Sequence, residues 1–265
     1  MKKSRIASTF ERIKKEGRKA FIPYIMAGDP DLYKTMERVL LLEKCGADIV
    51  ELGVPFSDPL ADGPTIQRAA ERALKAGVTL KKVLGFVSEL RYQTQIPIVL
   101  MTYYNPVFKY GEGRFVSDAV TAGADGVIIP DLPPEEAADL IKLSRTGKTQ
   151  PGLDTIFLAA PTSTLERAKR IVSASSGFVY YVSITGITGA GLTLDTTFKD
   201  HISMVRDLTG KPIAVGFGVS TPEEARIVAE SADGVIIGSA IVKKFHEDPA
   251  GAEEFIRGLR EAIRQ

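Results

Sequence analysis

Three carboxylates within residues 51–67 are the side chains of this chain best suited to chemistry. Glu51 is flanked by apolar residues, so we expect it at the end of a buried strand. Asp58 and Asp62 follow among glycines and prolines, which is typical of a shaped loop. A buried carboxylate is costly unless it is paired or used. Acid–base catalysis and a structural ion pair are both open at this point.

Glycines at two later strand ends form a second constellation. Gly218 follows one predicted strand, while Gly238 and Ser239 follow the next and open a helix. Exposed backbone N–H groups and a helix N-terminus can hold phosphate. The alternative is that these glycines only allow tight turns. Two such sites at adjacent strand ends favour phosphate.

Other chemistries find less support in the sequence. We find no lysine at a strand end, so an aldolase that works through a Schiff base is not expected. Asp58 and Asp62 could hold Mg²⁺, but nothing else in their loop supports a metal site. The two histidines, His201 and His246, lie away from the shaped loops. The glycine-rich residues 186–191 predict either a lid over the site or an ordinary mobile loop.

The elements that must position these groups alternate along the chain. Short apolar runs centred near residues 22, 50, 99, 128, 157, 180, 214 and 236 are mostly followed by apolar residues at helical spacing. Eight such units predict a single (β/α)₈ TIM barrel domain over residues 1–265. It has a short extra N-terminal helix and a short phosphate-binding helix after the eighth strand. A doubly wound open sheet is the alternative, because periodicity cannot show closure.

A short turn motif recurs between helix and strand. Each copy lies between a helical pattern and a strand: Cys45-Gly46-Ala47-Asp48, Ala122-Gly123-Ala124-Asp125 and Ser231-Ala232-Asp233. We interpret them as one kind of turn used three times.

Composition limits the class of protein. The chain has 265 residues, 44% of them hydrophobic, and a net charge of +1, which does not favour nucleic acid or an anionic membrane as partner. The N-terminus lacks the apolar core of a signal peptide, and Cys45 is the only cysteine. These features predict a cytoplasmic protein without an internal disulfide.

The motifs also resemble a known family. Residues 51–67 read Glu-Leu-Gly-Val-Pro-Phe-Ser-Asp-Pro-Leu-Ala-Asp-Gly-Pro-Thr-Ile-Gln, and this stretch is similar throughout to the signature of the tryptophan synthase alpha subunit family. Further matches lie at residues 100–106, 129–133, 160–163, 180–183, 186–189 and 216–218. The resemblance runs from about residue 21 to residue 244. It implies a TIM barrel that cleaves indole-3-glycerol phosphate to indole and glyceraldehyde 3-phosphate. It also implies a beta-subunit partner in an α₂β₂ complex, with pyridoxal phosphate in the partner and no cofactor in this chain.

The resemblance also implies roles for particular residues. Glu51 is the general acid/base, Asp62 the second catalytic carboxylate and Tyr180 a supporting tyrosine, while Asp58 lies in the loop that faces the beta subunit. The phosphate donors are Gly189, Gly218, Gly238 and Ser239. The indole pocket is lined by Tyr24, Met101, Tyr103, Ile129 and Phe217.

The chemistry of the residues agrees with these roles. Burial should raise the pKa of Glu51 so that it donates and accepts protons near neutral pH. An ionised Asp62 suits the indole N–H. The chain departs from the family at Ile187 and Gly191, and residues 144–152 are slightly long. Two other functions stay open: a different phosphate-binding barrel enzyme, or a subunit that only activates its partner.

Overall fold

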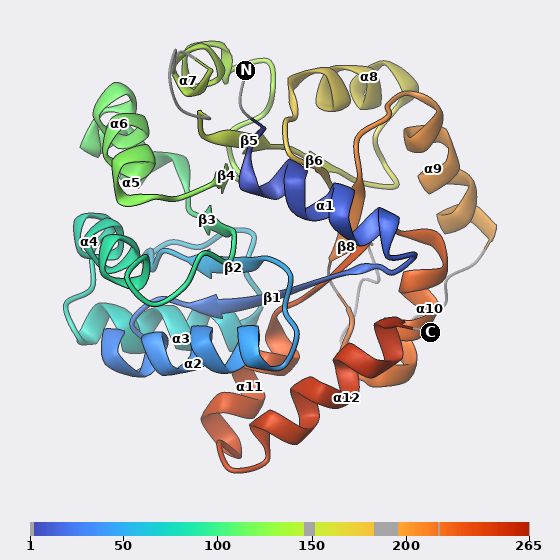
Figure 1. The fold of residues 1–265 in the computed structure, drawn as a ribbon. Coiled ribbons are helices and arrows are strands. Elements are labelled where there is room, and N and C mark those ends of the chain that lie inside the picture. The colour runs from blue at the N-terminus through green and yellow to red at the C-terminus, as the bar shows by residue number, and fades with distance from the viewer. Residues whose placement is uncertain (1–2, 146–151, 183–195, 217, 265) are drawn as a thin grey trace.

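The fold is a ring of parallel strands surrounded by helices (Figure 1). It is seen in a computed structural model, which describes residues 3–145, 152–182, 196–216 and 218–264. The lid predicted at residues 186–191, including Ile187, Gly189 and Gly191, lies outside the described residues, as does Phe217. The described strands are β1 Ala20–Met26, β2 Val50–Gly53, β3 Ile98–Met101, β4 Gly126–Ile128, β5 Asp154–Ile156, β6 Leu158–Ala159, β7 Val179–Val182, β8 Ile213–Gly216 and β9 Gly234–Ile237.

The order of the strands confirms the predicted barrel. The nine strands pair in the order β5-β4-β3-β2-β1-β9-β8-β7-β6. The two end strands, β5 and β6, are separated along the chain by Phe157 alone, whose carbonyl accepts from the N–H of Tyr180 at 3.2 Å. One segment therefore pairs with β4 through its first half and with β7 through its second, so the ring closes. The alternative of an open sheet is wrong, and the eight predicted strands become nine because this segment is divided.

Helices follow most strands, as the alternation predicts. Their bounds are α1 Arg5–Lys15, α2 Leu32–Lys44, α3 Pro64–Lys75, α4 Leu80–Leu90, α5 Tyr104–Tyr110, α6 Glu112–Ala122, α7 Ala138–Ser144, α8 Leu165–Ala174, α9 Thr196–Asp207, α10 Pro222–Ser231, α11 Ser239–Glu247 and α12 Ala252–Arg264. The extra N-terminal helix is α1, and the predicted short helix after the last strand is α11.

Helix α5 is not expected from the sequence. Pro106 interrupts the apolar pattern there, but it lies in the first turn of α5, where the missing N–H costs little. The carboxylate of Asp131 accepts the N–H of Tyr104 at 2.8 Å and so satisfies one free donor at the start of the helix. Gly111, with φ of +91°, then separates α5 from α6.

The amino ends of the strands are held by the recurring turn. Asp48, Asp125 and Asp233 each use a carboxylate oxygen to accept the N–H of a residue on the neighbouring strand, at 3.0, 2.8 and 2.9 Å, from Phe21, Ile98 and Ile213 respectively. The prediction of one turn used three times is confirmed. Each carboxylate also pairs with arginine.

Helix α1 covers the same end of the barrel (Figure 1). Its buried face includes Ile6 and Phe10, and the Phe10 ring lies 5.7 Å from that of Phe178 at the start of β7. This end is closed by packing and ion pairs, which leaves the carboxyl ends of the strands for chemistry.

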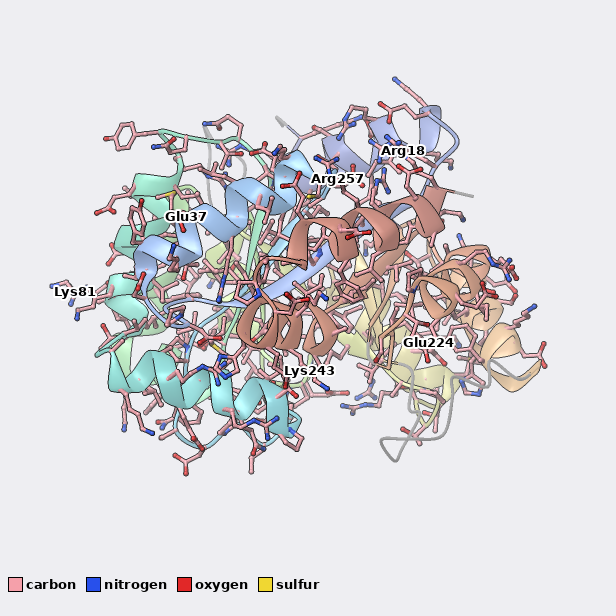
Figure 2. The ribbon with its side chains drawn as sticks, turned by 90° about the horizontal axis from the view of Figure 1, so that it is seen from below. Arg18, Glu37, Lys81, Glu224, Lys243 and Arg257 are labelled. Carbon is pink, nitrogen blue, oxygen red and sulfur yellow. The ribbon has the colours of Figure 1, made fainter. Side chains whose placement is uncertain are left out.

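Charged side chains lie on the outside of the helices. Figure 2 labels Glu37, Lys81, Lys243 and Arg257, which are all exposed. Within the ranges that the structure describes, none of the helices has the length and apolar character needed to cross a membrane.

Candidate active site

Glu51 is a buried carboxylate and the second residue of β2, so the expectation that it ends the strand is wrong, since Leu52 and Gly53 continue the strand beyond it. It is 1% exposed, and neither of its oxygens has a hydrogen-bond partner in the described part of the chain. Burial, followed by the negative charge of Asp62, raises the pKa of Glu51 to about 8. The alternative of a structural ion pair is wrong for the described residues, because none of their cations contacts Glu51. The predicted rise in pKa is confirmed.

Asp62 lies in the loop between β2 and α3. Burial raises its pKa to about 6, although a hydrogen bond from the Tyr103 hydroxyl works in the opposite direction. The same hydroxyl accepts the N–H of Ala61 at 3.0 Å. Tyr103 therefore holds both the loop backbone and the carboxylate. Because the pKa of Asp62 lies below that of Glu51, there is a pH range in which Asp62 is ionised while Glu51 is neutral.

Two buried tyrosines each lie over a glycine of the neighbouring strand. A Cβ at Gly53 would lie 2.1 Å from the Tyr24 hydroxyl, and one at Gly216 would lie 2.3 Å from the Tyr180 hydroxyl. Burial raises the pKa of each phenol well above its ordinary value. The negative charges of Asp62 and Glu51 raise it further. Both phenols are therefore neutral near pH 7. The glycines leave the space that these rings need.

Most of the predicted indole pocket is described by the structure. Tyr24, Met101, Tyr103 and Ile129 are between 4% and 8% exposed and come from β1 and from the ends of β3 and β4. Phe56 was missed by sequence reasoning, although its ring lies 5.4 Å from that of Tyr103. Its position in the loop after β2, which also carries Asp62, could have identified it from the sequence.

The predicted phosphate donors that are described follow neighbouring strands. Gly218 comes after β8 with φ of +80°, and Gly238 follows β9 directly before α11. Gly218 and Ser239 are exposed. They lie at the same end of the barrel as the loop with Asp62, because β2, β8 and β9 run parallel to one another around the ring.

Asp58 lies apart from Glu51 on the surface of the loop after β2. It is exposed and accepts a hydrogen bond of 2.5 Å from the Ser57 hydroxyl. Leu60, two residues further, is 91% exposed. This part of the loop faces outward.

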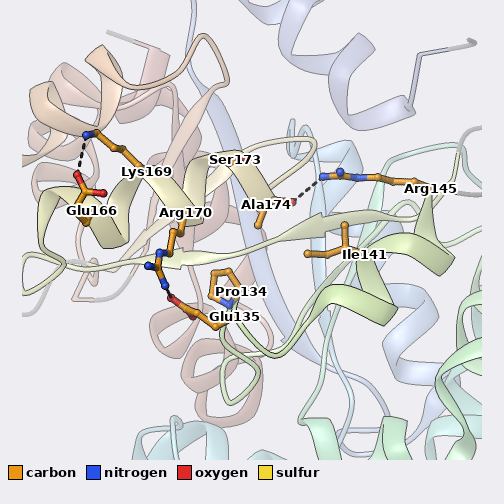
Figure 3. Close-up of a pocket in the computed structure, with 9 residues that line it drawn as sticks. All are labelled: Pro134, Glu135, Ile141, Arg145, Glu166, Lys169, Arg170, Ser173 and Ala174. Carbon is orange, nitrogen blue, oxygen red and sulfur yellow. Dashed lines mark hydrogen bonds and ion pairs between the residues drawn. The ribbon is translucent and has the colours of Figure 1, made fainter.

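A cleft of about 620 Å³ lies elsewhere, between α7 and α8 (Figure 3). Most of its charged side chains pair with one another, as in the 2.8 Å contact between Lys169 and Glu166, while Arg145 donates to the carbonyl of Ala174. None of the predicted site residues lines it, so the acid–base chemistry does not belong there. Its lining residues are Pro134, Glu135, Ile141, Arg145, Glu166, Lys169, Arg170, Ser173 and Ala174.

The described ranges contain no group of three or more acidic, histidine or cysteine side chains placed to bind a metal ion. The site instead combines a neutral buried carboxyl, a second carboxylate and neutral phenols. This combination suits proton transfer between buried groups. A closed ring of parallel strands surrounded by helices defines the class of (β/α)₈-barrel proteins, whose active sites lie at the carboxyl ends of the strands.

Comparison with known proteins narrows this class. A sequence model of the family "Tryptophan synthase alpha chain" matches residues 10–265, and the chain belongs to this family. The tryptophan synthase alpha chain of Geotalea uraniireducens is 54% identical over 245 residues, covering 92% of this chain and 90% of the relative.

Solved structures agree with this assignment. The tryptophan synthase subunit alpha of Legionella pneumophila superposes with a TM-score of 0.90 at 40% identity, covering 99% of both chains. A chain of Mycobacterium tuberculosis tryptophan synthase gives 0.91 at 38% identity, with full coverage of both.

Proposed function

We propose that this chain is a lyase of tryptophan biosynthesis that cleaves indole-3-glycerol phosphate to indole and glyceraldehyde 3-phosphate. The observation that carries the proposal is Glu51, a buried carboxyl without a partner among the described residues, whose pKa is raised to about 8. Such a group is protonated at neutral pH and can both give and take a proton there.

The two carboxylates divide the work. Neutral Glu51 delivers its proton to the indole carbon that carries the glycerol chain. Ionised Asp62 holds the indole N–H, which gains positive charge in this step. The Glu51 carboxylate then takes the proton of the adjacent side-chain hydroxyl. The carbon–carbon bond breaks, its electrons return to the ring, and an aldehyde forms while Glu51 regains its proton.

The remaining predicted residues bind and orient the substrate. The N–H groups of Gly218, Gly238 and Ser239 hold the phosphate, with the N-terminus of α11 adding its favourable dipole. Tyr24, Met101, Tyr103 and Ile129 surround the indole ring, and Tyr180 supports the site. Gly189 is proposed as a further phosphate donor, and Phe217 as a further residue of the indole pocket.

The chain acts with a partner. We infer a beta subunit, in an α₂β₂ complex, that binds pyridoxal phosphate and consumes indole. The loop with Asp58 and Leu60 is exposed and so is accessible to such a partner. A single barrel domain and a cytoplasmic location stay predictions.

Replacement of Asp62 tests the division of roles. We expect Asp62→Asn to lower indole release in the presence of the beta subunit by at least a hundredfold, about the effect of losing one electrostatic stabiliser. Asp118→Asn on the exposed face of α6 is the control and should leave turnover unchanged. Equal turnover of Asp62→Asn and the native chain would reject the role of Asp62. Failure of the native chain to bind an indole-propanol phosphate would favour a different phosphate-binding enzyme.

A further inference from the structure

The hydroxyl of Tyr24 has no part in the proposed reaction, in which only the Tyr24 ring contacts the indole. Strands β1 and β2 lie side by side (Figure 1). They pair in parallel, with Tyr24 and Glu51 as register partners. Partners of this kind place their side chains on the same face of a sheet, and Gly53, two residues after Glu51, shares that face. The phenol and the carboxyl therefore rise from neighbouring positions into the barrel.

The close approach between Gly53 and the Tyr24 hydroxyl shows where the end of the phenol lies. A Cβ on Gly53 would lie 2.1 Å from the Tyr24 hydroxyl oxygen and 2.7 Å from the carbon that bears it. The Tyr24 ring thus leans across β2, and its hydroxyl lies over the backbone just beyond Glu51. The Tyr180 hydroxyl lies over Gly216 on β8 instead, so the two phenols occupy different parts of the site.

Neither group has a good partner in the part of the chain that is described. The acceptor that the structure gives the Tyr24 hydroxyl is the sulfur of Met26, at 4.0 Å. A thioether is a weak acceptor. Both oxygens of Glu51 lack partners among the same residues. A buried donor with a weak acceptor therefore lies beside a buried acceptor with no donor.

Two of the other titratable groups around the pair, Asp62 and Tyr103, do not replace this donor. The charges that act on Tyr24 are those of Asp62, Glu51, Tyr103 and Tyr180. Asp62 can only accept when ionised, and the Tyr103 hydroxyl is occupied by the Asp62 loop.

We propose that Tyr24 is a positioning residue whose hydroxyl donates a hydrogen bond to the Glu51 carboxylate whenever Glu51 is ionised. The inference rests on the proposed function, in which Glu51 alternates between the neutral and ionised forms. The phenol keeps its proton throughout. A hydrogen bond to a charged acceptor is stronger than one to a neutral acceptor. The bond therefore strengthens during the step in which Glu51 has given up its proton, and it changes turnover more than substrate binding.

Tyr24→Phe tests the proposal, because it removes the hydroxyl and keeps the ring. Indole release is measured against pH with the beta subunit present. Activity needs ionised Asp62 and neutral Glu51, so we expect a bell-shaped profile whose basic limb reports Glu51. Without the donor the ionised form of Glu51 is less stable. We expect the basic limb to move to higher pH, by about one unit, and kcat to fall about tenfold with little change in KM.

Tyr181→Phe is the matched control. Tyr181 is the next residue after Tyr180 and is also buried, and its hydroxyl lacks a partner among the described residues. Its ring lies 5.8 Å from that of Phe198 on α9, outside the barrel interior. Its removal should leave both limbs of the profile in place.

A second variant keeps the test decisive if Tyr24→Phe does not fold. Replacing Tyr24 with 3-fluorotyrosine retains the hydroxyl and makes it a stronger donor, so the basic limb should move to lower pH. Profiles of both variants that superimpose on the native one would overturn the proposal while native turnover continued to support the function. Absence of native turnover, with the beta subunit present, would overturn both.

Discussion

The N–H of Ala61 donates a 3.0 Å hydrogen bond to the hydroxyl of Tyr103. Because Asp62 follows Ala61, this bond fixes the second carboxylate of the site to the end of β3. The same hydroxyl lowers the pKa of Asp62 against the effect of burial.

Tyr103→Phe should therefore affect the acidic limb of the pH profile. The variant loses the hydrogen bond that stabilises ionised Asp62, so the pKa of Asp62 rises further and activity appears only at higher pH. With a rise of about one pKa unit, we expect kcat/KM to fall about tenfold near pH 5 and only about twofold near pH 7. The control is Tyr104→Phe, whose hydroxyl contacts Glu112 at 3.2 Å on the outside. An acidic limb that does not move would show that Tyr103 does not act on Asp62.

Gly216→Ala should displace Tyr180. The added methyl would lie 2.3 Å from the Tyr180 hydroxyl, well inside contact distance, so the ring must move. Overpacking of this kind costs about 1–3 kcal/mol of stability, and we expect kcat/KM to fall at least tenfold because Tyr180 leaves its place. Gly85→Ala is the control, since it lies in α4 with open space around it and should be slightly stabilising. An active and fully stable Gly216→Ala variant would contradict this packing.

Glu51→Gln should change how stability depends on pH. The pKa of Glu51 is about 8 in the folded chain and near 4.5 when unfolded. Between these values the folded chain binds one more proton, so its stability falls as pH rises through this window. Because glutamine does not ionise, the Glu51→Gln variant does not lose this stability as the pH rises. Its free energy of unfolding, compared with that of the native chain, should improve by about 3 kcal/mol from pH 5 to pH 8.5. Urea unfolding at several pH values measures the difference, and a constant difference would show that Glu51 ionises normally.

Asp125→Asn should destabilise the chain without changing the chemistry. The Asp125 carboxylate accepts from Arg5 and Arg91, each at 2.7 Å, and from the N–H of Ile98 at the amino end of the barrel. We expect a loss of about 2–3 kcal/mol in the free energy of unfolding, with KM and kcat unchanged at a temperature where the variant is folded. An altered KM would show that the two ends of the barrel are not separate in function.

The barrel could be predicted because each of its strands is a short apolar run, as at Ala20–Met26, where all seven residues are buried. Closure of the barrel could not be predicted, because it depends on how residues 154–159 divide their hydrogen bonds between β4 and β7. Helix α5 was missed because Pro106 is compatible with a first turn but reads as an interruption in the sequence.

The residues of the site could be predicted from motifs, but the contacts between them could not. The sequence places Glu51 in an apolar setting, so its raised pKa follows from residue types alone. The position of the Tyr24 hydroxyl over Gly53 depends on strand register and twist. The bond between Tyr103 and Ala61 joins residues on different elements, which no local pattern specifies.

The most direct test of the account is indole release from indole-3-glycerol phosphate by the native chain and by Glu51→Gln, each with the beta subunit present. We predict that the native chain releases indole and that the variant binds the beta subunit but releases none. Release by the variant at the native rate would contradict the role of Glu51. If neither chain released indole while both bound the beta subunit, the chain would be an activating partner and the proposed catalysis would be wrong.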